Sequence, residues 1–298
     1  MSGRTDWDNG FIAVDWGTTN RRAYLVEGGS RHSREFEDKQ GILAVGRGQF
    51  EAAVEQVRER LGDHPLLLGG MIGSNRGWME APYVPCPAGL DDLARGLVWP
   101  AERTAAIVPG VSCSNGRADV MRGEEVQILG ALASRDIPND CIVCHPGTHN
   151  KWVRVSNGRI DSFRTVMTGE LFNLLRDRSI LSDLLDGTAQ ASDTFGEGVR
   201  QSLSGTGVTA LLFEARARFL LGRLDKADAA SFVSGLLIGE DVRVGLAEYS
   251  GLPLVVMGRP ELITLYRSAL DLAGANSDAV DGEEAFVAGA YSIVERIQ

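Results

Sequence analysis

The sequence FIAVDWGTTNRRAYLVEGG, residues 11–29, places a polar turn between two short apolar runs. Residues 11–14 have the continuously apolar pattern of a strand buried on both faces, and residues 24–26 supply a returning strand. Gly17 lets the backbone approach a ligand closely, and the turn can direct amides and hydroxyls at one anion. These donors belong to Thr18, Thr19 and Asn20. The stretch predicts a phosphate-binding hairpin, with an ordinary hairpin closed by an Asx-type turn as the alternative.

Asp15 lies at the end of the first apolar run, directly before this turn. A carboxylate cannot itself bind phosphate, because both groups are anionic. The two are compatible when a hard cation lies between them, and Mg²⁺ commonly uses one carboxylate, phosphate oxygens and several waters. We therefore expect Asp15 to bind Mg²⁺.

The second half of the chain repeats this pattern. Residues 140–144 form an apolar strand, HPGTHNKW (residues 145–152) supplies a polar turn, and residues 152–155 return as a strand. The donors in and after this turn are Gly147, Thr148, His149 and Lys151. Two lobes with related turns can bind a polyphosphate from both sides, and 298 residues are enough for two cores.

The segment after the apolar run at residues 65–71 has the composition of a binding loop. It is rich in Gly, Pro and aromatic residues, and it follows the end of a strand, where open α/β sheets bind ligands. Ser74, Asn75 and Arg76 offer polar groups to a substrate, and Trp78 and Tyr83 can form the walls of its pocket. The alternative is a Pro-stiffened surface loop with buried aromatic side chains.

A helix is expected to begin at about residue 124, with Val126, Leu129 and Leu132 on its buried face. Glu124 and Glu125 then fall in its first turn, where the helix dipole favours an ionised carboxylate. Either glutamate can act as a general base, and either can serve only to complement the dipole.

Later helices carry further candidates. Gly235 and Gly239, four residues apart in a long helix, allow either close helix packing or the approach of a flat ligand. Gly258 stands between a strand and a helix, an arrangement that suits an adenine-ribose pocket. A third strand at residues 159–166 is expected to close a β-meander in the second half of the chain, and Thr168 is expected to cap the helix that follows it.

Composition limits the classes of partner. The net charge of −10 argues against a nucleic-acid groove or an anionic membrane surface as the general partner. No apolar run approaches the roughly 18 residues of a membrane span. The polar start MSGRTDWDNG lacks the apolar segment of a signal peptide, so we expect a cytoplasmic protein.

The four cysteines include Cys141 and Cys144, which with His145 match the C-x-x-C-H pattern of haem attachment. Their position in an apolar strand argues against haem, and it points the two side chains to opposite faces. We expect free, buried thiols.

Six blocks of the chain together resemble the 2-keto-3-deoxygalactonate kinase family of the actin, sugar-kinase and heat-shock-ATPase superfamily. They are DWGTTNRRAYL, GGMIGSNRGWMEAPY, VMRGEE, PGTHNKWV, FRTVMTGEL and SGLLIGEDV. The resemblance implies an α/β, two-lobe, actin-like ATPase (ribonuclease H-like) fold with a cleft. Residues 1–135, with a returning helix at 285–298, are the expected sugar-acid lobe, and residues 136–284 the nucleotide lobe.

The resemblance further implies transfer of the ATP γ-phosphoryl group to the 6-hydroxyl of 2-dehydro-3-deoxy-D-galactonate, with Mg²⁺. It places Arg22 among the phosphate ligands and the catalytic base at Glu124 or Glu125, with Glu125 favoured by similarity to exopolyphosphatases. Lys151 can neutralise phosphate charge. An exopolyphosphatase-like hydrolase and a non-catalytic sugar or nucleotide sensor are the alternatives. Preference for the galactonate or the gluconate epimer stays open, as does assembly into a homo-oligomer.

Overall fold

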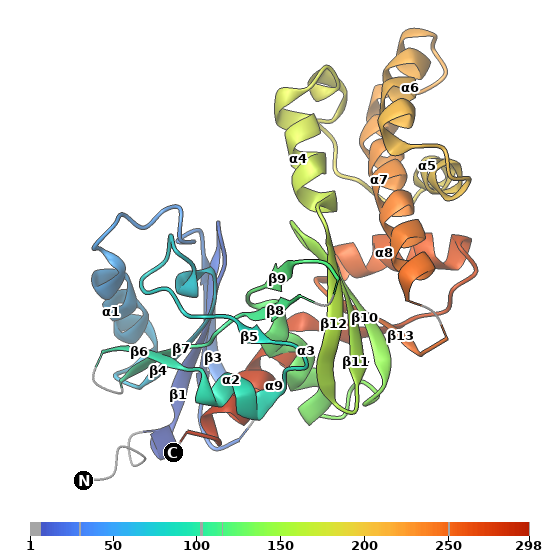
Figure 1. Ribbon diagram of the computed structural model, residues 1–298. Helices are drawn as coiled ribbons and strands as arrows, with labels where there is room; N and C mark the ends of the chain where they lie inside the picture. The colour runs from blue at the N-terminus through green and yellow to red at the C-terminus, as the bar shows by residue number, and fades with distance from the viewer. Residues whose placement is uncertain (1–6, 30, 102–103, 115, 250, 298) are drawn as a thin grey trace. The chain divides into compact units, whose positions relative to one another are not determined.

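The computed structural model describes residues 7–29, 31–101, 104–114, 116–249 and 251–297 (Figure 1). The chain divides into two compact units. Unit 1 contains Met1–Asn139, Val155–Ser162 and Gly282–Gln298, and unit 2 contains Asp140–Arg154 and Phe163–Asp281.

Unit 1 is built on a six-stranded sheet of order β3-β2-β1-β4-β7-β6. The strands are β1 (Phe11–Trp16), β2 (Arg21–Val26), β3 (His32–Asp38), β4 (Leu66–Gly70), β6 (Val98–Ala101) and β7 (Ala105–Ile107). The first three strands form an antiparallel meander, and β1, β4 and β7 run parallel. The hairpin predicted for residues 11–29 is therefore confirmed, with Asp15 opposite Arg22.

Helices cover both faces of this sheet, with α1 (Phe50–Leu61) on one face and α3 (Glu124–Ala133) and α9 (Gly282–Val294) on the other (Figure 1). The α1 helix buries the apolar stripe predicted from its spacing. Helices α3 and α9 cross closely, since a Cβ at Gly130 would lie 1.9 Å from the Ala285 carbonyl oxygen. The remaining elements are η1 (Trp7–Asn9), η2 (Met71–Gly73), α2 (Leu90–Arg95), β5 (Val84–Pro85), β8 (Val111–Cys113) and β9 (Asp119–Met121).

The second sheet has the order β12-β11-β10-β13-β14. Its strands are β10 (Cys141–His145), β11 (Asn150–Ser156), β12 (Arg159–Val166), β13 (Leu254–Gly258) and β14 (Asp278–Asp281). Three consecutive strands are followed by two parallel neighbours, as in unit 1. The internal repeat predicted from the two polar turns is confirmed.

Unit 2 also contains a group of helices, centred on the long helix α7 (Lys226–Glu248). The others are α4 (Thr168–Arg178), η3 (Ser182–Leu184), α5 (Asp193–Leu203), α6 (Val208–Leu220) and α8 (Pro260–Leu272). The prediction that Thr168 caps α4 was wrong. Met167 is the N-cap residue, and the hydroxyl of Thr168 instead donates a hydrogen bond to Asp241.

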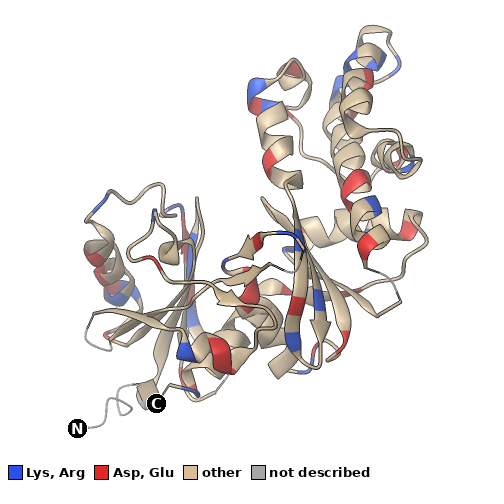
Figure 2. Cartoon of the chain, viewed as in Figure 1, with Lys and Arg blue, Asp and Glu red and all other residues tan. Residues whose placement is uncertain are grey.

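All four cysteines are free, and three of them, including Cys141 and Cys144, are buried, while Cys86 is half-buried. Acidic and basic residues are interspersed along the helices and strands of both units, so the negative charge is not confined to one of them (Figure 2). Within the described part of the chain, no helix is both long and apolar enough to cross a membrane.

Candidate functional site

The first polar turn is fixed on one side by a neighbouring loop. The Gly17 amide donates to the Asn20 carbonyl oxygen at 2.9 Å, which closes the turn. The carbonyl oxygens of Gly17, Thr18 and Thr19 accept hydrogen bonds from the backbone amides of residues 41–43, at 3.0–3.2 Å. The side chains of Thr18 and Thr19 are exposed. The turn thus has bound carbonyls and accessible hydroxyls, as an anion site requires, and its binding of phosphate stays a prediction.

Two glycines bring Asp15 close to the start of α3. Gly70, at the end of β4, has a φ of +83°, and a Cβ there would lie 2.8 Å from the Trp16 carbonyl oxygen and 3.4 Å from Asp15 Oδ1. Gly123, directly before α3, has a φ of +115°, and its Cβ would lie 3.3 Å from the Gly70 Cα. Both backbone conformations favour glycine. The half-buried Asp15 and the first turn of α3 therefore belong to one region of unit 1.

Two predicted phosphate ligands of this hairpin bind carboxylates. The side-chain amide of Asn20 donates to Glu37 at 2.7 Å. Arg22 forms ion pairs with Glu283 at 2.7 Å and with Glu37 at 3.3 Å, and its side chain is 14% exposed. Their roles toward phosphate stay predictions.

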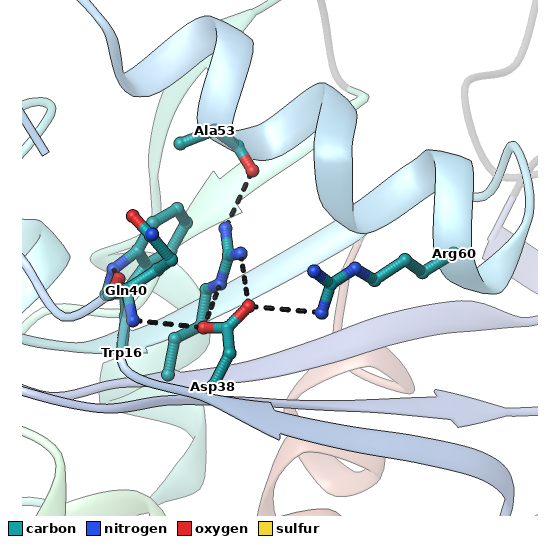
Figure 3. Close-up of polar contacts among 6 residues, drawn as sticks. Trp16, Asp38, Gln40, Ala53 and Arg60 are labelled. Atoms are coloured by element: carbon teal, nitrogen blue, oxygen red, sulfur yellow. Dashed lines mark hydrogen bonds and ion pairs between the residues drawn. The ribbon is translucent and has the colours of Figure 1, made fainter.

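Arg21, which the sequence analysis overlooked, braces the hairpin against α1. It does so through Asp38 and Ala53, which are labelled in Figure 3. Its side chain is fully buried and forms an ion pair of 2.8 Å with Asp38, and it donates to the Ala53 carbonyl oxygen at 2.8 Å. The guanidinium also lies 4.9 Å from the centroid of the Trp16 ring. Strand alternation was the available signal, because it puts Arg21 on the apolar face with Ala23.

The two glutamates at the start of α3 differ in burial. Glu125 is fully buried, and both of its carboxylate oxygens accept hydrogen bonds from the Gly123 amide, at 2.8 and 2.9 Å. Glu124 is half-buried and accepts from the Arg122 amide at 3.1 Å. Burial, assisted by the charge of Glu124, raises the pKa of Glu125 to about 8. A carboxyl group with this pKa is suited to accepting a proton near neutral pH, so Glu125 remains the predicted base. Because its side chain is fully buried, contact with a substrate hydroxyl requires the residues that cover it to move.

Three of the predicted substrate ligands line one pocket in unit 1. Asn75, Arg76 and Trp78 border a pocket of about 280 Å³, together with Arg47 and the start of α1. Asn75, Arg76 and Arg47 are exposed, so their polar groups can reach a ligand. Arg47 was missed because it lies in a Gly-rich segment that gave no pattern.

The other two predicted ligands have structural contacts. The hydroxyl of Ser74 donates to the Met71 carbonyl oxygen at 2.7 Å and accepts from the Arg76 amide at 3.3 Å. Ser74 thus holds the loop in shape. Tyr83 packs against Arg122, whose guanidinium lies 4.4 Å from the ring centroid. Neither residue is among those that border the pocket of Arg76.

The second polar turn, between β10 and β11, is bound to the start of α4. The Thr148 carbonyl oxygen accepts a hydrogen bond from the Glu170 amide at 2.9 Å, and His149 contacts the Glu170 carboxylate at 2.5 Å. The side chains of Thr148 and His149 are exposed, and a Cβ at Gly147 would meet no atom within 4 Å. This turn has space for a ligand.

Lys151 lies just beyond the turn, and its side chain is buried. It is 4% exposed, and its ammonium group donates to the Thr165 hydroxyl at 2.8 Å. Contact between Lys151 and phosphate, which stays a prediction, therefore requires this side chain to move.

The nucleoside prediction for Gly235 and Gly239 was wrong. A Cβ at Gly235 would lie 2.2 Å from the Phe195 carbonyl oxygen, and one at Gly239 would lie 2.8 Å from that of Val199. The backbone of α5 occupies the face on which a ligand was expected, so these glycines serve helix packing. Gly258 ends β13 with a φ of +151°, and its nucleoside role stays a prediction.

Asp241 of α7 is a further buried carboxylate that the sequence analysis missed. It accepts hydrogen bonds from four side chains, which are Asn150, Trp152, Thr168 and Tyr266. The available signal was an acidic residue at the end of the apolar block SGLLIGEDV.

The donor set around Asp15 is compatible with Mg²⁺. Among the residues that the structure describes, no group of three or more His, Cys, Asp or Glu side chains could hold a metal ion. Mg²⁺ does not need such a group when phosphate oxygens and waters complete its coordination. A single half-buried carboxylate beside two exposed threonine hydroxyls fits that mode of binding.

Comparison with known proteins adds independent observations. The model of a family described as 2-keto-3-deoxy-galactonokinase matches residues 15–293. The chain is 36% identical to the 2-dehydro-3-deoxygalactonokinase of Escherichia coli (strain K12), over 96% of this chain and 98% of that protein. It is also 36% identical to a probable 2-dehydro-3-deoxygalactonokinase of Rhizobium meliloti (strain 1021), over 94% of each chain.

Solved structures are similar as well. A crystal structure from Sinorhizobium meliloti, assigned as a 2-dehydro-3-deoxygalactonokinase protein, has a TM-score of 0.89 and 34% identity, covering 96% of this chain and 99% of that one. The activator of the 2-hydroxyisocaproyl-CoA dehydratase from Clostridium difficile, with bound ADPNP, has a TM-score of 0.52 at 11% identity, over 96% and 95% of the two chains. The second likeness concerns the fold alone, and the predicted actin-like ATPase fold is confirmed.

Proposed function

The chain belongs to the 2-keto-3-deoxy-galactonokinase family, and we propose that its polar turns and the carboxyl groups beside the first of them carry out that family's phosphoryl transfer. It is an ATP-dependent sugar-acid kinase that transfers the γ-phosphoryl group of ATP to the 6-hydroxyl of 2-dehydro-3-deoxy-D-galactonate. The observation that carries this conclusion is the 36% identity to the 2-dehydro-3-deoxygalactonokinase of Escherichia coli over 96% of the chain. The exopolyphosphatase-like and sensor alternatives gain no support from these relatives.

For the phosphate groups, we propose that Thr18 and Thr19 of the first turn and Thr148 of the second donate hydrogen bonds to ATP. Asp15 would hold Mg²⁺, which supplies charge neutralisation when bound. Phosphoryl transfer depends mainly on positioning and on such neutralisation. Asp15→Asn should lower kcat by orders of magnitude with an unchanged melting curve, and wild-type turnover would remove Asp15 from the site.

For the sugar acid, we propose that its carboxylate binds in the pocket of Asn75 and Arg76. Guanidinium groups form strong, charge-assisted hydrogen bonds with carboxylates, and Arg47 provides a second one at the same pocket. Arg76→Ala should mainly raise KM for the sugar acid. Arg95 is an exposed arginine of α2, and the control variant Arg95→Ala should leave this KM unchanged. An unchanged KM in Arg76→Ala would move the carboxylate site elsewhere.

We further propose that the first lobe, residues 1–135 with the returning helix, binds the sugar acid and that the second, residues 136–284, binds most of the nucleotide. Amide hydrogen exchange tests this division, because ADP alone should slow exchange around residues 146–149, and sugar acid alone around residues 74–78. The opposite pattern would reverse the roles.

We also propose a cytoplasmic location, since ATP is available there, and cell fractionation can check it.

The experiment that tests the function is a coupled assay of ADP release with a panel of 2-keto-3-deoxy sugar acids. We expect ADP release only when a sugar acid is present, with the galactonate and gluconate epimers compared directly. Release of phosphate from ATP or polyphosphate without a sugar acid would support the hydrolase. Ligand binding without any turnover would support the sensor.

A further inference from the structure

Asp241 is a carboxylate buried entirely within unit 2. Its side chain is 0% exposed, and α7 around it is mostly apolar. The Oδ1 atom accepts from Trp152 Nε1 at 2.7 Å, and both oxygens accept from Asn150 Nδ2 at 2.9 Å. The Oδ2 atom also accepts from the hydroxyl groups of Tyr266, at 2.6 Å, and Thr168. One carboxylate thus joins α7 to β11, α4 and α8.

Burying a carboxylate in this way costs free energy, which suggests that Asp241 has a role in the fold or in function. Burial raises the pKa of Asp241 above its ordinary value, and the four donors oppose that increase. Taking a carboxylate out of water is unfavourable unless its hydrogen bonds compensate for the lost hydration. An apolar residue could fill the same space, so the question is what the four bonds hold in place.

One of the four donors directly follows the second polar turn. Asn150 is the first residue of β11, and its side chain is fully buried. Its amide nitrogen is bound by Asp241, and its amide oxygen lies 3.8 Å from the thiol of Cys144 on β10. Asp241 therefore fixes the chain where it leaves the turn.

Another donor lies at the helix that contacts the turn. Thr168 is the first residue of α4, and the next residue, Gly169, packs against the turn so closely that a Cβ would lie 2.4 Å from the Gly147 carbonyl oxygen. The Glu170 amide then donates to the Thr148 carbonyl oxygen at 2.9 Å. By binding Thr168, Asp241 holds the helix start against the turn.

We propose that Asp241 is a positioning residue for the nucleotide, which holds the turn at residues 146–149 in its phosphate-binding shape through Asn150 and Thr168. Asp241 itself touches no ligand. The inference rests on the proposed function, because it assumes that this turn binds the phosphates of ATP.

A matched pair of variants separates this role from simple stabilisation. Thr168→Val and Tyr266→Phe each remove one hydroxyl donor to the same Oδ2 atom. Thr168 adjoins the turn, whereas Tyr266 lies on α8. Both variants should lower Tm. Only Thr168→Val should raise the Kd for Mg·ADP and the KM for ATP, by about tenfold for loss of one hydrogen bond to a charged group.

Two further measurements complete the test. KM for the sugar acid should stay within about twofold of wild type in both variants, a change of under 0.5 kcal/mol. Thr168→Ser keeps the hydroxyl and should restore Mg·ADP binding. If Thr168→Val does not fold, Thr168→Ala carries the same expectation.

The proposal is overturned if folded Thr168→Val binds Mg·ADP as wild type does, or if Tyr266→Phe weakens binding equally. In both cases wild-type kinase activity would leave the proposed function intact. A wild-type protein that neither binds Mg·ADP nor phosphorylates a sugar acid would overturn the proposed function and this inference together.

Discussion

At the scale of single residues, Glu125 should determine how the rate depends on pH. Its carboxyl has a pKa of about 8 because it is buried, and only the ionised form can accept a proton from the attacking hydroxyl. We predict that kcat/KM rises with pH and levels off above about 8. Glu125→Gln should lose most of kcat with little change in KM. Steady-state kinetics from pH 6 to 9 provide the measurement.

Glu124→Gln is the matched control, because the neighbouring carboxylate is half-buried and bonded to a different amide. It should retain most of the wild-type kcat. If Glu124→Gln is the inactive variant instead, the assignment is wrong by one residue. If both variants stay active, the base lies outside α3.

The same carboxyl should leave a mark on stability. Burial raises the pKa of Glu125 from its ordinary 4.5 to about 8, so the folded state binds this proton more tightly than the unfolded state. The stability that this provides is complete below about pH 4.5 and is lost as pH rises through about 8. We predict that Glu125→Gln raises Tm relative to wild type more at pH 9 than at pH 6. Equal differences at both pH values would contradict a raised pKa.

At the scale of elements, the first turn depends on one glycine of the loop beside it. A Cβ at Gly41 would lie 2.3 Å from the Thr19 carbonyl carbon and 2.4 Å from the Thr18 carbonyl oxygen, so the turn would have to move. We predict that Gly41→Ala costs about 1–3 kcal/mol of stability and weakens ATP binding. Thermal unfolding and KM for ATP measure the two effects.

Gly207→Ala is the control for this substitution. Gly207 has a φ of −57°, and a Cβ there would meet no atom within 4 Å. Its Tm and KM should stay near wild type. A Gly41→Ala variant with the wild-type Tm would show that the turn is not held by this loop.

Local patterns predicted the elements whose neighbours lie nearby in the sequence. The hairpin strands and α1 were found because burial imposes its period on their residues. The strand β14 was missed, since its residues Asp278–Asp281 are mostly exposed and only pairing with β13 makes them a strand. Thr168 was misread for a similar reason, because its partner Asp241 is 73 residues away. Contacts of that range leave no local signal.

At the scale of the whole molecule, the repeated strand, polar turn and returning strand in the two halves of the chain could be predicted from the two turns and the apolar residues beside them, whereas the order of the strands in each sheet could not. The candidate site was predicted less completely. The turns, the α3 glutamates and the Arg76 pocket were located from residue type and position. The partners that bind Arg22, Lys151 and Asn20 could not be predicted, because ion pairs and buried hydrogen bonds depend on side-chain placement.

Phosphorus NMR of one reaction mixture shows directly whether the chain phosphorylates a sugar acid at a primary hydroxyl. The mixture contains the protein, ATP, Mg²⁺ and 2-dehydro-3-deoxy-D-galactonate. We expect a new phosphomonoester signal, split into a triplet by the two protons on carbon 6, that grows in step with ADP. Accumulation of inorganic phosphate in place of that signal, at the same rate with and without the sugar acid, would contradict it.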